Sequence, residues 1–163
     1  MRRPVMKNRI VLLGFLVLVA SAASHLTLRA EQAPRHPLSE IRLAHAPRTV
    51  WDSIYSDSQA TRGQTIFGQT CVKCHGETLQ GIDDALPLAG NSFLDGWNNK
   101  SVGSLYERIS SSMPDDDPGS LTKQQVADVI AYMLRFNRFP AGSVELPTQA
   151  DLLKEIMIVP AKP

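Results

Sequence analysis

The sequence predicts an all-α domain, and three observations carry this prediction. Apolar residues recur at helical spacing in 101–111 and 122–136, where positions i, i+3, i+4 and i+7 are occupied. Thr122 and Gln125 form a capping box, which is a signature of a helix start. Loops that contain proline and glycine separate the periodic segments. The 163 residues suit one small domain with extensions.

The first and last predicted core helices are expected to cross. The first spans 58–70, and Gly63 and Phe67 share one of its faces because they lie four residues apart. The last spans 122–136 and ends ahead of Pro140. Glycine has no side chain to keep a neighbouring backbone away, so Gly63 permits a close crossing of the two helices.

Shorter elements are expected at both ends of the domain. Residues 49–55 should pack an apolar edge onto it, and residues 156–159 are β-prone and should lie against it. Besides 122–136, three of the predicted helices have a residue that can cap their start. The cap candidates are Ser56 or Asp57 for 58–70, Asn91 or Ser92 for 92–97, and Thr148 for 149–155.

Both cysteines of the chain lie in Cys71-Val72-Lys73-Cys74-His75, which has the pattern C-x-x-C-H. This spacing is typical of covalent c-type haem attachment. The two thiols form thioethers with the vinyl groups of one porphyrin, and the histidine becomes the proximal ligand of the iron. The sequence therefore predicts one covalent haem c held by Cys71, Cys74 and His75.

Two other interpretations of the cysteine pair compete with haem attachment. A zinc site needs two further ligands at short spacing, and the chain has no second cysteine pair. A thiol–disulfide redox motif belongs to a βαβ framework, which the sequence does not indicate. The motif therefore favours haem. Outside it we find no paired carboxylates, phosphate-binding loop or nucleophile–base set that would predict a catalytic residue.

The second axial ligand decides what a bound haem does. An open position permits gas binding or peroxide chemistry, whereas a methionine thioether gives an electron carrier. Met133 lies on the apolar repeat of its helix and Met157 lies in the tail, so both are interpreted as packing residues. Met113 stands in a proline-flanked loop, where an apolar side chain has little structural purpose. We therefore expect His75 and Met113 to bind the iron.

Two loops are expected to border the haem. A proximal histidine usually donates its second ring N–H to a backbone carbonyl, and residues 86–90 are expected to supply that carbonyl to His75. Residues 115–117 are three aspartates, most simply a solvated turn. The alternative is an acidic patch that steers a basic partner towards the haem edge.

The N-terminal segment is predicted to be a signal peptide or an uncleaved membrane anchor. Four basic residues precede an apolar run of 14 residues, Ile10 to Ala23, and Ala20-Ser21-Ala22 matches a cleavage site. The run is shorter than the ~20 residues of a usual membrane span. Both interpretations export the rest of the chain, which is then periplasmic or membrane-anchored facing the periplasm.

The predicted organisation follows from these features. A proline-containing segment with His25, His36 and His45 is interpreted as a linker with solvated histidines. Cleavage would leave 13 Lys and Arg against 16 Asp and Glu, a net charge of −3, which disfavours nucleic acid as a partner. The expected divisions are signal peptide or anchor 1–22, linker 23–48, haem domain 49–147 and C-terminal tail 148–163.

Over residues 50–147 the chain resembles class I monohaem c-type cytochromes, the small bacterial cytochrome c domains found alone or attached to quinoprotein dehydrogenases and oxidases. The resemblance implies a cytochrome c fold, in which the first and last helices cross around one haem. It also implies that Met113 is the second axial ligand of the iron. It also implies that Trp97 and Tyr106 lie near the haem propionates or edge. Leu86 stands where the family often has a first proline. The resemblance rests on Gly63 and Phe67 before the haem motif, on Pro87-Leu88-Ala89-Gly90, on Met113-Pro114, and on residues 118–122 leading into 126–132.

The predicted function is electron transfer by one haem with His/Met ligation, in a periplasmic respiratory or dehydrogenase chain. The expected partners are redox proteins such as a quinoprotein dehydrogenase or an oxidase, and the protein is expected to be a carrier or the cytochrome subunit of such a complex, without catalytic residues. The alternative is a haem enzyme or a gas or redox sensor with an open distal site.

Overall fold

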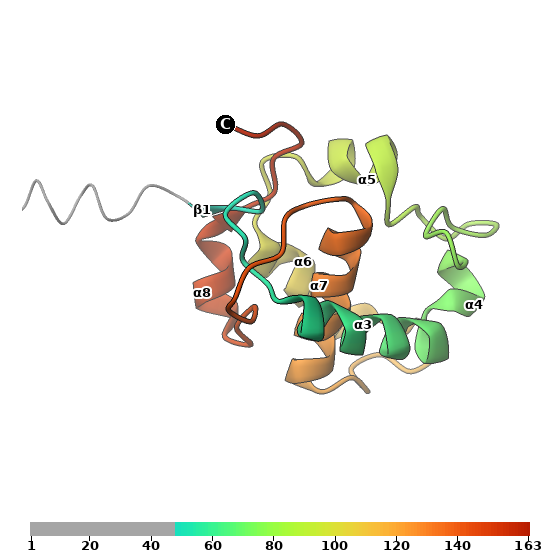
Figure 1. Cartoon of the computed structure of the whole chain (residues 1–163). Helices are drawn as coiled ribbons and strands as arrows, with labels where there is room; N and C mark the ends of the chain where they lie inside the picture. The colour runs from blue at the N-terminus through green and yellow to red at the C-terminus, as the bar shows by residue number, and fades with distance from the viewer. Residues whose placement is uncertain (1–47) are drawn as a thin grey trace, which may run out of the picture. The chain divides into compact units, whose positions relative to one another are not determined.

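A computed structural model of the chain describes residues 48–163 (Figure 1). The predicted signal peptide or anchor, and the predicted linker with its three histidines, lie outside these residues except for Arg48. Among residues 48–163, none of the helices combines the length and the apolar character of a membrane span.

The described residues form an all-α domain, as predicted, with one pair of short parallel strands. Figure 1 shows α3 crossing α7 near the centre of the domain. Loops without regular structure connect the helices, and the longest of them follows the haem motif. The elements are β1 (Arg48–Thr49), α3 (Asp57–Thr70), α4 (Val72–His75), α5 (Gly90–Trp97), α6 (Val102–Ser112), α7 (Lys123–Phe136), α8 (Ala150–Lys154) and β2 (Ile156–Met157).

The two core helices begin at the predicted caps. The side chain of Ser56 accepts a hydrogen bond from the backbone N–H of Gln59 at the start of α3. At the start of α7, Thr122 and Gln125 form the predicted capping box, with donor–acceptor distances of 3.2 and 2.8 Å. These bonds satisfy N–H groups that a helix start would otherwise leave unpaired.

The predicted close crossing is confirmed at Gly63. A Cβ atom at this position would lie 1.8 Å from the backbone oxygen of Asp128, so only glycine allows the observed approach of α3 to α7. Phe67, one turn further along α3, packs on Tyr132 of α7 with ring centroids 5.3 Å apart. Met133 on the same helix is buried, which confirms its interpretation as a packing residue.

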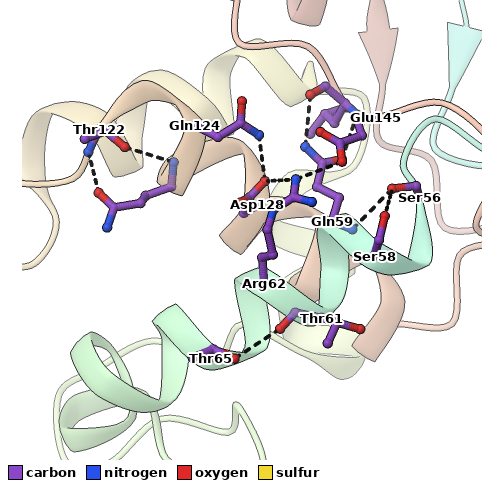
Figure 2. Close-up of polar contacts among 12 residues, drawn as sticks. Ser56, Ser58, Gln59, Thr61, Arg62, Thr65, Thr122, Gln124, Asp128 and Glu145 are labelled. Atoms are coloured by element: carbon purple, nitrogen blue, oxygen red, sulfur yellow. Dashed lines mark hydrogen bonds and ion pairs between the residues drawn. The ribbon is translucent and has the colours of Figure 1, made fainter.

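An ion pair also joins the crossing helices. The guanidinium of Arg62 on α3 donates two hydrogen bonds to the carboxylate of Asp128 on α7, at 2.9 and 3.0 Å (Figure 2). The Asp128 side chain is 4% exposed, and Gln124 donates a further bond to it at 2.8 Å. Arg62 also pairs with Glu145 at 2.9 Å. A buried carboxylate needs such partners because its desolvation is otherwise very unfavourable.

The C-terminal tail packs against the helices, as expected. Leu153, Ile156 and Ile158 are almost fully buried. The strand β2 pairs in parallel with β1, and the indole N–H of Trp51 donates to the carbonyl of Val159 at 3.0 Å. The expected apolar edge at 49–55 is also confirmed, since Val50, Ile54 and Tyr55 are buried.

Two predicted helix starts were wrong. The helix α5 begins at Gly90, after Ala89, and neither Asn91 nor Ser92 caps it. Its first N–H donates instead to the side chain of Asn137 at 2.9 Å, a partner distant in sequence. The helix α8 follows Gln149, and no side chain caps it.

The substitution Gly63→Ala is expected to destabilise the domain by about 3 kcal/mol or more, because the new methyl overlaps a backbone carbonyl that cannot move alone. Gly68→Ala is the matched control on the same helix, since a Cβ there meets no atom within 4 Å. It should stabilise the protein by about 0.5–1 kcal/mol through helix propensity. Urea unfolding followed by circular dichroism measures both changes, and equal effects would contradict the close crossing.

The tail offers a second matched pair. Leu153→Ala should cost about 2–5 kcal/mol of stability, since this side chain is fully buried between α8 and the core. Leu152→Ala, at a neighbouring side chain that is 51% exposed, should change stability by less than about 0.5 kcal/mol. A small effect at both positions would show that the tail does not contribute to the folded core. Thermal and urea unfolding provide the measurement.

Candidate functional site

The haem motif directly follows the first core helix. Cys71 ends α3, where its backbone N–H donates to the carbonyl of Phe67 at 2.9 Å, and it also precedes α4. Neither cysteine forms a disulfide, and Cys71 is partly buried whereas Cys74 is exposed. Burial raises the pKa of the Cys71 thiol to about 11. Cys71 and the single turn of α4 together bring the two sulfur atoms and the His75 imidazole onto one short segment.

The side chain of His75 is oriented by the loop that follows it. Its Nδ1 lies 3.0 Å from the backbone oxygen of Leu86, within the stretch predicted to supply the acceptor. An Nδ1–H that donates to this carbonyl leaves Nε2 with a free lone pair, which is the form of histidine that binds a metal. The resulting donor set of two thiols and one oriented imidazole fits a covalently bound haem.

The loop that carries Leu86 is folded back on α4. The N–H of Gly81 donates to the carbonyl of His75 at 3.0 Å, and the N–H of Ile82 donates to that of Cys74 at 2.9 Å. Leu79 is fully buried, and its backbone has a φ of 59°, a conformation that residues other than glycine seldom adopt. Its carbonyl accepts a hydrogen bond from the N–H of Leu88 at 2.8 Å. These contacts hold the acceptor of His75 in place.

Asn137, at the end of α7, fixes the far end of this loop. Its side-chain amide donates to the carbonyl of Leu88 at 3.0 Å, and its side-chain oxygen accepts from the N–H of Gly90 at 2.9 Å. Neither Asn137 nor Leu79 was predicted from the sequence to hold this loop. An asparagine just after the last apolar repeat of a helix is a recognisable end signal, but it does not reveal a partner 49 residues away.

Met113 lies on a different segment, at the end of α6. Its N–H donates to the carbonyl of Ile109 at 3.0 Å, and its partly buried side chain packs against the core. The following turn carries Asp116, which pairs with Lys73 between the two cysteines. This ion pair brings the loop after Met113 to the haem motif, although the structure leaves the ligand role of Met113 a prediction.

The aspartates of this turn are exposed, in agreement with a solvated turn. The hydrogen bond from Lys73 lowers the pKa of the Asp116 carboxyl, and the same bond raises the pKa of Lys73. Within residues 48–163, no three side chains of His, Cys, Asp and Glu come together as a metal-binding group.

The two aromatic residues singled out by resemblance lie on helices that are consecutive in the sequence, Trp97 on α5 and Tyr106 on α6. Trp97 is partly buried and tilts against Phe93 with centroids 6.3 Å apart, and the Lys100 ammonium lies 5.3 Å from its ring centre. Tyr106 is almost fully buried, and its hydroxyl donates to the carbonyl of Lys123 at 3.4 Å. Their proximity to a haem stays a prediction.

Comparison with known proteins identifies the family of this region. The family described as cytochrome C oxidase, cbb3-type, subunit III matches residues 58–133, from the first turn of α3 to near the end of α7. No curated protein matches the chain. Among solved structures, the sulfane dehydrogenase SoxCD from Paracoccus pantotrophus is 21% identical, with a TM-score of 0.46, and the match covers 82% of this chain and 68% of that chain.

The matched region contains most of the crossing helices and the C-x-x-C-H motif. It also contains residues 113–120, which we call the Met113 loop. The helices, the crossing at Gly63 and the position of the motif after the first core helix agree with the family's all-α fold. Residues 58–133 therefore form a c-type cytochrome domain with a cytochrome c fold, which points to haem-based electron transfer.

Proposed function

We propose that the protein is an exported electron carrier with one haem c, attached covalently to Cys71 and Cys74 and ligated by His75 and Met113. The observation that carries this proposal is the bond between His75 Nδ1 and the Leu86 carbonyl, since it frees Nε2 for iron. When bound, the haem supplies an iron that alternates between Fe(III) and Fe(II).

The remaining work of the site falls to this chain's own residues. Leu79 and Asn137 hold the loop that orients His75, so the imidazole is fixed before and after electron transfer. A thioether from Met113 would exclude water and other ligands from the second axial position and raise the reduction potential. Rigid ligands keep the structural change on oxidation small, which favours rapid electron transfer.

We further propose that the electrons pass to and from redox protein partners of the dehydrogenase or oxidase kind. The chain is then a carrier or the cytochrome subunit of such a complex. A signal peptide or anchor in residues 1–22 would deliver it to the periplasm, where it could remain tethered to the membrane by an uncleaved N-terminus. Domain 49–147 would carry the haem, and the tail 148–163 would complete its core.

Covalent attachment can be tested by mass spectrometry of the full chain expressed with haem-maturation machinery. The intact protein should gain the mass of one haem, located on the peptide that contains residues 71–75. The double variant Cys71→Ala/Cys74→Ala should lose the haem on acid–acetone extraction, because thioethers are then absent. Recovery of the wild type as colourless protein with two alkylatable thiols would refute the proposal. The same spectrum reports whether residues 1–22 have been removed.

The ligand role of Met113 can be tested with isosteric replacements. Met113→Leu should abolish the weak long-wavelength band of a methionine–Fe(III) bond and lower the reduction potential, since leucine keeps the size but removes the sulfur. Met133→Leu and Met157→Leu are the controls, and both should leave band and potential unchanged. If the wild type lacks the band and its Fe(II) form binds carbon monoxide readily, the distal site is open and the protein is a haem enzyme or sensor.

A further inference from the structure

A single ion pair connects the segment that holds His75 with the segment that holds Met113. Lys73 Nζ, from the turn of α4, contacts Asp116 Oδ2, three residues beyond Met113. Among the hydrogen bonds and ion pairs formed within residues 48–163, no other joins residues 71–76 to residues 113–120. The two segments would lie on opposite faces of a haem bound by His75 and Met113.

We propose that Lys73 and Asp116 are positioning residues that form a clamp, which keeps the Met113 loop closed over the haem. The inference rests on the proposed His75 and Met113 ligation. Neither residue touches the iron in this role. The clamp acts through Met113, because a loop that opens withdraws the thioether.

The Met113 loop has few other contacts that would keep it closed. Its backbone hydrogen bonds are short-range, from Asp117 to Pro114 at 3.0 Å and from Ser120 to Asp117 at 3.3 Å. The residues from Asp115 to Ser120 are exposed. A segment with little buried apolar surface opens locally at low free energy, so one additional contact changes its open fraction measurably.

Lys73 is a suitable anchor because its backbone is fixed. The N–H of Gly76 donates to the carbonyl of Val72 at 2.8 Å, and thioethers on both neighbouring cysteines would restrain the turn further. Both charged side chains are more than half exposed, at 55% and 62%. Exposed ion pairs are weak, so the clamp should shift the opening equilibrium by about two- to fivefold.

The experiment measures how readily imidazole displaces the methionine in the full-length ferric holoprotein. Imidazole binds only when the loop opens, so its Kd reports the opening equilibrium. Lys73→Gln and Asp116→Asn should each lower this Kd by about two- to fivefold, and the double variant should fall no further than the larger single effect. Lys162→Gln and Asp115→Asn remove charges without a described partner, and they should leave the Kd unchanged.

The reduction potential separates the clamp from a simple charge effect. Loss of a cation near the iron stabilises Fe(III) and lowers the potential, whereas loss of an anion raises it. Lys73→Gln and Asp116→Asn should therefore shift the potential in opposite directions while shifting the imidazole Kd in the same direction. Kd shifts of opposite sign would overturn the clamp, and so would unchanged Kd values. The reversed pair Lys73→Asp/Asp116→Lys should restore the wild-type Kd.

Met113→Leu distinguishes failure of the clamp from failure of the ligand assignment. This variant should lower the imidazole Kd far more than either clamp variant, because no thioether then competes. If it does not, Met113 is not the ligand and the proposed function is wrong. If it does, but Lys73→Gln and Asp116→Asn match the control variants, the ligand is correct and the clamp is refuted.

Discussion

The backbone oxygen of Asp128 occupies the space that any side chain at position 63 would need. The rest of the domain depends on this contact between α3 and α7. It fixes the distance between the helices and allows Phe67 to reach Tyr132. It also brings Arg62 within reach of the buried Asp128 carboxylate, and a carboxylate left in the interior without such a partner would strongly destabilise the fold.

The same crossing positions the two chain segments that hold the candidate haem site. The end of α3 leads directly into Cys71 and α4, while the end of α7 carries Asn137. Asn137 holds Leu88 and Gly90 at the far end of the loop that supplies the Leu86 carbonyl, and this carbonyl orients His75. A change in the angle between the core helices would therefore move the acceptor of the imidazole relative to the imidazole itself.

Features encoded locally could be predicted from the sequence. The starts of α3 and α7, the burial of Met133 and the acceptor stretch for His75 depend on neighbouring residues or on a specific motif. Long-range polar partners could not be predicted in this way. The first N–H of α5 is satisfied by Asn137, 47 residues away, and Lys73 meets Asp116 across 43 residues. No local propensity encodes either pairing, and the left-handed backbone of Leu79 contradicts the usual preference of leucine.

The pairing of β1 with β2 determines how a mechanical load would travel through the domain. The described structure begins at Arg48, and this residue is paired with Ile156 near the opposite end of the chain. Next to it, the N–H of Val50 donates to Met157, and Ile158 is bonded in turn to Lys100. Tension applied through residues 1–47 would thus spread into the C-terminal tail and the start of α6 before it reached α3. The pairing of β1 with β2 would have to yield before that tension reached the crossing helices and the segment of His75.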